Sequence, residues 1–63
     1  MRFQFIGDDL NLLSDKNFND FEEVSKLAEE LFGNMSGINR YISILNLDNM
    51  AAYKFDEEGL KRL

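Results

Sequence analysis

The segment from Asp20 to Gly33, DFEEVSKLAEELFG, constrains the fold more than any other part of the chain. At 100° per residue its apolar side chains fall within an arc of about 140°, and the opposite side carries only polar ones. The apolar positions are Phe21, Val24, Leu27, Ala28, Leu31 and Phe32. Asp20 and Glu23 have capping-box spacing, as do Asn19 and Glu22 one residue earlier. The pattern predicts an amphipathic helix that ends at Gly33, a residue able to adopt positive φ in the C-terminal cap.

Alternating patterns before this segment predict a strand and its return. Residues 2–6 alternate polar and apolar side chains, with Phe3 and Phe5 on one face, as in a half-buried strand. The sequence Gly7-Asp8-Asp9 is a turn signal, and residues 10–12 alternate again as a short return strand. Residues 14–19 are polar apart from Phe18, so we expect a loop anchored by that phenylalanine.

Two further strands are predicted after the helix. In residues 38–47, INRYISILNL, the side chains of Ile42 and Ile44 share one face, and Tyr41 lies on the other. Apolar side chains on both faces indicate a central or covered strand. Residues 51–55 form a return strand with Tyr53 and Phe55 on one face. Residues 56–62 carry acids first and bases last, which predicts a short terminal helix weakened by its glycine.

These elements predict one α+β domain over residues 1–63. One amphipathic helix packs on a small, mostly antiparallel sheet of three or four strands, in the order β(β)-α-β-β. No apolar run is long enough to span a bilayer and no signal peptide is evident, so we expect a cytoplasmic protein without membrane contact.

The composition argues against catalysis. The chain has no cysteine and no histidine, so it lacks thiolate metal ligands, disulfides and the usual general base near neutral pH. A domain of this size also has little room for a substrate pocket. We therefore predict a protein that is not an enzyme and that uses neither a metal nor another cofactor.

The charge is unevenly distributed along the chain. The net charge is −5, and eight of the twelve acidic residues lie between Asp8 and Glu30. Lys26 is spaced to pair with Glu22 and Glu30, which explains part of this acidity as an ordinary solvated helix face. The chain has no basic patch, so nucleic acid is not the expected partner. The residues predicted to contact a basic surface of another protein are Asp8, Asp9, Asp20, Glu22, Glu23, Glu29 and Glu30.

The second predicted contact region is an apolar face of the sheet, with Tyr41 and Tyr53 as aromatic anchors. Tyrosine is enriched in interface cores, and one helix covers only one face of a sheet. The uncovered face would be occupied by a partner, by a second copy in a homodimer, or by terminal residues folding back. We predict a non-enzymatic protein-binding module, a small inhibitor or adaptor that uses the acidic helix face, the sheet face or both. Phage and mobile-element inhibitors offer an analogy of size and charge only.

A different function is indicated by residues 27–42, LAEELFGNMSGINRYI, which resemble the helix-turn-helix DNA-binding motif. The resemblance covers about a quarter of the chain. The spacing from Ala28 to Gly33 is one residue longer than in the motif, and the groove-reading segment offers only Arg40 as a cation. A DNA-binding regulator of this kind would use Leu27–Leu45, and it requires residues 38–45 to be helical.

Overall fold

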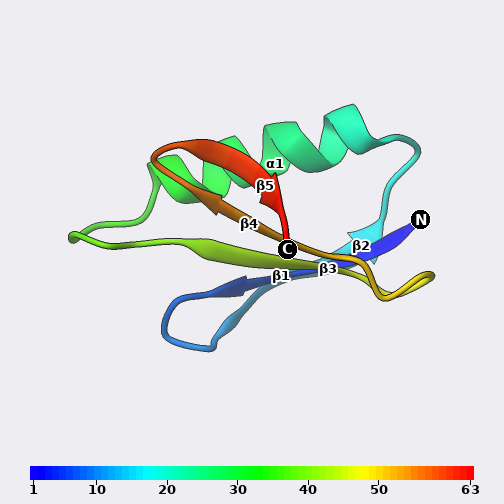
Figure 1. Ribbon diagram of the computed structural model, residues 1–63, viewed down its shortest axis with the longest axis horizontal. Helices are drawn as coiled ribbons and strands as arrows, with labels where there is room; N and C mark the ends of the chain where they lie inside the picture. Colours follow the sequence, from blue (N-terminus) through cyan, green and yellow to red (C-terminus); the bar gives the residue numbers. More distant parts are fainter.

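The computed structural model, which describes residues 1–63, contains one helix and five strands (Figure 1). The elements are β1 (Arg2–Gly7), β2 (Leu12–Asn17), α1 (Phe21–Gly33), β3 (Ile42–Asn46), β4 (Ala52–Asp56) and β5 (Gly59–Arg62). All strands are antiparallel to their neighbours in a single sheet of order β2-β1-β3-β4-β5. The predicted α+β class is confirmed, but the sheet has five strands rather than three or four, and the order is β-β-α-β-β-β rather than β(β)-α-β-β.

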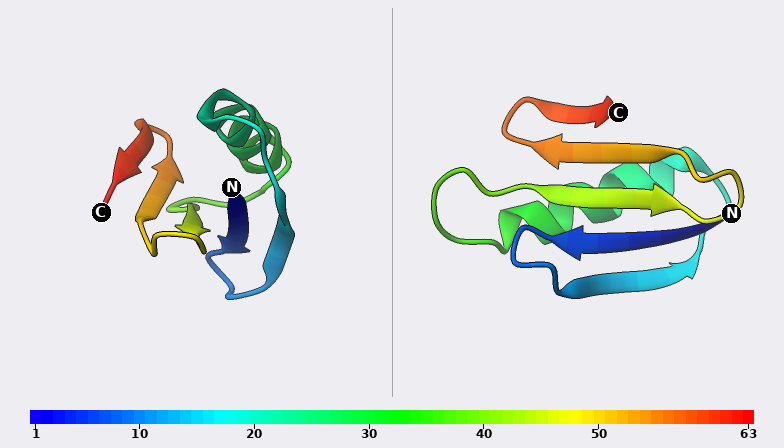
Figure 2. Two further views of the ribbon diagram at one scale, coloured as in Figure 1. Left: turned by 90° about the vertical axis from the view of Figure 1, so that its right-hand side faces the viewer. Right: turned by 60° about the horizontal axis from the view of Figure 1, so that its bottom comes forward.

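Helix α1 links two locally connected groups of strands. The chain forms the β1–β2 hairpin, crosses one face of the sheet as α1, and returns as the β3–β4–β5 meander (Figure 2). The crossing brings β3 beside β1, in a register that runs from Gly7 opposite Ile42 to Phe3 opposite Asn46. Strands β1, β3 and β4 therefore occupy the interior of the sheet, with β3 at its centre, while β2 and β5 form its edges.

The core lies between α1 and strands β1 and β3. Phe3, Phe5, Ile42 and Ile44 are fully or almost fully buried. They share a cluster with Val24 and Ala28, the two buried residues of α1, and with Phe18. Burying one such large side chain stabilises a fold by about 1.5–3 kcal/mol, so this cluster is the main attachment of the helix to the sheet.

The start of α1 follows the predicted capping pattern. Asp20 is the N-cap, and its Oδ1 accepts a hydrogen bond from the backbone N–H of Glu23 at 3.0 Å. The carboxylate of Glu23 accepts in turn from the backbone N–H of Asn19 at 3.1 Å, one residue before the cap. The end of the helix differs from the prediction, because Gly33 is the last helical residue and Asn34, with φ −91°, is the C-cap.

Three predicted segments have a different structure. The return strand expected at residues 10–12 begins only at Leu12, because the turn extends through Leu10, which has positive φ. Most of residues 14–19, expected to be a loop, belongs to β2, because an edge strand exposed to water tolerates polar side chains. The expected terminal helix is instead the β4–β5 hairpin. Gly59 adopts φ +101°, and the side chain of Asp56 accepts from the N–H of Glu58 at 2.9 Å. A glycine with positive φ after a tight turn favours a hairpin and opposes a continuous helix.

The length of α1 also bears on membrane insertion. The helix has 13 residues and one acidic face, and it lacks the length and the apolar character that crossing a bilayer requires.

Candidate protein-interaction surface

Three segments that are distant in the sequence meet at one end of the molecule. They are the β1–β2 turn, the last part of α1 and the β4–β5 turn, which lie at the same end of the sheet (Figure 2). The register explains this, since Gly7 pairs with Ile42, and Ile42 pairs with Phe55. We call this region the acidic end. Its acidic residues are Asp8, Asp9, Glu29, Glu30, Asp56, Glu57 and Glu58.

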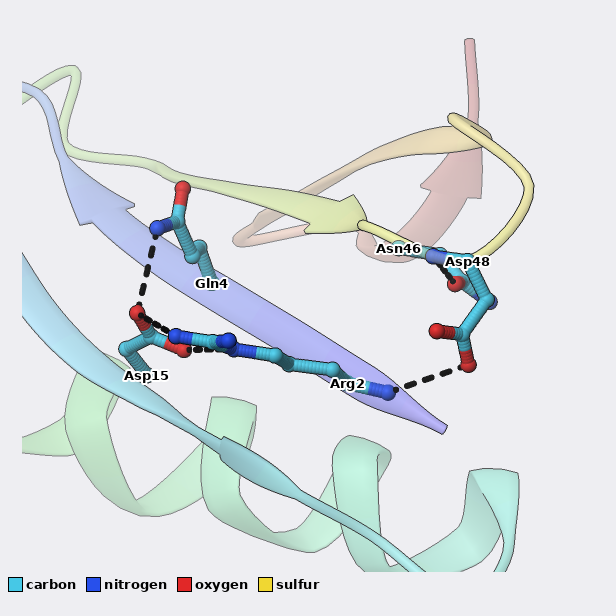
Figure 3. Close-up of polar contacts among 5 residues, drawn as sticks. All are labelled: Arg2, Gln4, Asp15, Asn46 and Asp48. Carbon is cyan, nitrogen blue, oxygen red and sulfur yellow. Dashed lines mark hydrogen bonds and ion pairs between the residues drawn. The ribbon is translucent and has the colours of Figure 1, made fainter.

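Acids elsewhere on the sheet have structural partners. Asp15 accepts from Nε and Nη2 of Arg2 at 2.8 and 3.0 Å, and from the amide of Gln4 at 3.2 Å (Figure 3). These hydrogen bonds, together with the positive charge of Arg2, hold the pKa of Asp15 below its ordinary value. Asp48 accepts from the backbone N–H of Arg2 at 3.3 Å and donates its own N–H to the buried side chain of Asn46. Both carboxylates therefore hold strands or turns together.

The predicted contact residues in the first half of α1 are also engaged locally. Asp20 and Glu23 cap the helix. Lys26 forms an ion pair with Glu22 at 3.7 Å, and it leaves Glu30 unpaired. These three acids are the N-cap and two residues of the first turn of α1, at the other end of the helix from Gly33. Their positions are explained without a partner.

Three carboxylates of the acidic end also have hydrogen-bond or ion-pair partners within the protein. Asp9 accepts from the backbone and the side-chain amide of Asn11 at 3.1 and 2.8 Å. Asp56 forms an ion pair with Lys54 at 3.8 Å. Glu58 pairs closely with Lys61, and this hydrogen bond raises the pKa of that lysine.

Four carboxylates have neither an ion pair nor a hydrogen bond, and all four belong to the acidic end. They are Asp8, Glu29, Glu30 and Glu57. The last turn of α1 contains no basic residue. Because the C-terminal end of a helix carries partial negative charge, acids near it cost about 0.3–1 kcal/mol each. Negative charge is thus concentrated where the local structure does not favour it.

Large apolar side chains are exposed at the same end. Leu10, in the β1–β2 turn, is 83% exposed, and Ile38, in the loop between α1 and β3, is 88% exposed. Leu10 also has φ +69°, in the left-handed region that glycine or asparagine adopts more readily. Leu12, at the base of the same turn, is exposed too. Neither the solvation nor the backbone of this turn favours leucine at position 10.

The two tyrosines predicted as anchors do not share a surface. Tyr53 faces α1, and its ring centroid lies 5.1 Å from that of Phe21. Tyr41 lies on the opposite face of the sheet, where the ammonium group of Lys54 is 5.2 Å from its ring. That open face also carries the Arg2–Asp15 pair. The open face therefore combines Tyr41 with charged side chains rather than forming a continuous apolar surface, and Tyr53 is not part of it.

The helix-turn-helix resemblance requires residues 38–45 to be helical, but residues 42–45 belong to β3 at the centre of the sheet. The second helix of that motif is absent, so the resemblance of residues 27–42 is not a structural one. The structure also has no group of three or more acidic side chains placed to hold a metal ion.

The acids of the β4–β5 turn, Glu57 above all, were not among the predicted contact residues. Nothing in their spacing places them beside α1, because that proximity depends on the pairing of β3 with β4. Comparisons of the chain with known protein families, with curated proteins and with solved structures found no match.

Proposed function

We propose that this protein is a non-enzymatic protein-binding module, a small inhibitor or adaptor that contacts its partner through the acidic end. The observation that supports the proposal is the placement of the unpaired acids. Asp8, Glu29, Glu30 and Glu57 come from three separate segments that meet at one end, and none of them forms an ion pair. A partner with a basic surface would supply the missing positive charge.

The exposed leucine and isoleucine of the acidic end supply the apolar part of the interface. Interfaces combine a desolvated apolar centre with a polar rim. Leu10 and Ile38 belong to two loops at this end, and each is largely exposed in the free protein. Covering them with a partner would remove apolar area from water, and the surrounding carboxylates would direct the approach of the basic surface.

Charge neutralisation at the acidic end tests this proposal. The test variant combines Asp8→Asn, Glu29→Gln, Glu30→Gln and Glu57→Gln. The control variant, Asn17→Lys with Glu22→Lys and Ser25→Lys, changes the net charge by the same amount but leaves the acidic end intact. Each tagged protein is used to capture partners from a lysate of the native host, and captured proteins are quantified by mass spectrometry at low and high salt.

We expect the test variant to lose a partner that the unmodified protein and the control variant both retain. Higher salt should weaken that capture, because screening reduces attraction between exposed charges. Circular dichroism should show the same fold in all three proteins. Equal capture by the test and control variants would contradict a role for the acidic end.

A further inference from the structure

The surface has three hollows, and one of them differs from the others in its charge. The hollow beside Arg40 contains Lys54 as well as acids, and the hollow between β2 and α1 contains Lys16 and Lys26. The third hollow, of about 390 Å³, lies between the end of α1 and the β4–β5 turn. No basic residue lines it. Its lining includes two aromatic rings and four carboxylates: Phe32, Phe55, Glu29, Asp56, Glu57 and Glu58.

The aromatic part of this hollow is suited to a flat cation. The rings of Phe32 and Phe55 meet edge to face with centroids 5.4 Å apart, and both side chains are only half-buried. The guanidinium carbon of Arg40 lies 4.5 Å from the ring centroid of Phe32, although Arg40 does not line this hollow. The protein thus already places a guanidinium against this ring, the arrangement in which the negative face of an aromatic ring attracts a cation.

The carboxylates of the hollow are not all neutralised. Lys54 pairs with Asp56 and Lys61 pairs with Glu58, but Glu29 and Glu57 form no ion pair. They come from opposite walls, one from α1 and one from the β4–β5 turn. The C-terminal end of α1 adds partial negative charge beside them. A cation in the hollow would therefore meet two free carboxylates and an aromatic surface together.

We propose that this hollow receives an arginine side chain from a basic segment of the partner. The proposal rests on the proposed function and names the point on the acidic end where that partner is recognised. Arginine fits better than lysine because its planar guanidinium stacks on aromatic rings and donates to two carboxylates at once. The Phe32 ring provides the aromatic surface for stacking. Glu29 and Glu57, on opposite walls, provide the two carboxylates that accept hydrogen bonds.

Nuclear magnetic resonance titration of the ¹⁵N-labelled protein with a synthetic hexa-arginine peptide tests the proposal. The largest amide shift changes are expected at Glu29, Gly33, Glu57 and Gly59. Hexalysine should bind several-fold more weakly, and hexaglutamate should cause no shifts. The double variant Glu29→Gln/Glu57→Gln should raise the Kd for hexa-arginine about tenfold, because it removes both free carboxylates of the hollow.

The matched control is Asn17→Lys/Glu22→Gln, which makes the same charge change away from the acidic end and should alter the Kd less than about twofold. Phe32→Leu keeps an apolar side chain in place and should remove the preference for hexa-arginine over hexalysine. This last readout compares two peptides on the same variant, so a loss of stability alone would not produce it.

Absence of hexa-arginine binding would overturn this assignment, and so would shifts spread evenly over all acidic segments. Equal effects of the two double variants would also overturn it. Those outcomes leave the proposed function standing, because that function is tested separately by partner capture with the acidic-end variant. Localised shifts, lost in Glu29→Gln/Glu57→Gln and kept in the control, would support the hollow as the arginine site.

Discussion

The guanidinium of Arg2 and the carboxylate of Asp15 join β1 to β2 with two hydrogen bonds, of 2.8 and 3.0 Å, on the face of the sheet that α1 leaves open. Gln4 adds a third hydrogen bond to the same carboxylate. This cluster lies between the two strands of the N-terminal hairpin, one of which is an edge strand with little other side-chain anchoring. It gives the hairpin a polar link that depends on the charge of one aspartate.

The stability of the protein should therefore fall in acid through Asp15. Its pKa in the folded state lies below the ordinary value of 3.8, so its contribution is fully present above pH 3.8. That contribution is lost as the pH falls from 3.8 through the lower folded value. We expect Asp15→Asn to lower the melting temperature at neutral pH and to reduce its further fall on acidification. Thermal unfolding over a series of acidic pH values measures both effects, with Asp8→Asn as the control. An unchanged acid profile in Asp15→Asn would contradict this role.

The stability of the fold should be sensitive to truncation of Ile44, a core side chain that is 1% exposed. Truncation by Ile44→Ala leaves a cavity beneath α1 and should destabilise the fold by about 2–5 kcal/mol. That loss approaches the whole stability expected of a domain this small. Ile38→Ala removes the same atoms from a side chain that is 88% exposed and should change stability by less than about 0.5 kcal/mol. Urea unfolding followed by circular dichroism compares the two, and similar losses would contradict the position of the core.

Two glycines should respond to alanine in opposite directions. Gly59 has φ +101°, where a Cβ is strained, so Gly59→Ala should destabilise the β4–β5 hairpin by about 1 kcal/mol or more. Gly33 is helical, and a Cβ there would meet no atom within 4 Å. Gly33→Ala should therefore stabilise α1 by roughly 0.5 kcal/mol. Paired thermal melts measure the difference, and a stabilising Gly59→Ala would indicate that residues 56–62 are not a hairpin.

Leu10 should show a conflict between stability and binding. Leu10→Asn places a residue that tolerates φ +69° in the turn and removes an exposed apolar side chain. We expect a gain in stability of about 0.5–1 kcal/mol and weaker capture of the partner. Denaturation and quantitative capture on the same preparation give the two values. A variant that gains stability and captures equally well would remove Leu10 from the interface.

The helix and the strand faces were predictable because their side-chain periods are strong and local. The spacing of the six apolar residues of α1 and the alternation in β1, β3 and β4 can each be recognised within a short stretch of sequence. Strand β5 was missed for a physical reason. The acids at Glu57 and Glu58 and the bases at Lys61 and Arg62 match a helix dipole, and the backbone preference of Gly59 outweighs that match.

The candidate site was only partly predictable. Excess acid between residues 8 and 30 is visible in the sequence, but the sequence does not show which carboxylates have partners. Glu23 and Asp9 are used by a helix cap and a turn, whereas Glu57 becomes part of the acidic end through strand pairing. The separation of Tyr41 from Tyr53 likewise follows from the alternation of neighbouring strands.

The position of β1 between β2 and β3 has a consequence for the order in which the protein folds. Strand β2 follows β1 directly, but the pairing of Gly7 with Ile42 joins residues 35 positions apart. Closing a flexible loop of that length costs about 3 kcal/mol of chain entropy. Helix α1 shortens the flexible part of this loop, because its 13 residues form a rigid rod of about 20 Å. We expect the helix to act as a spacer that delivers β3 to β1, so its capping residues influence the folding rate as well as stability.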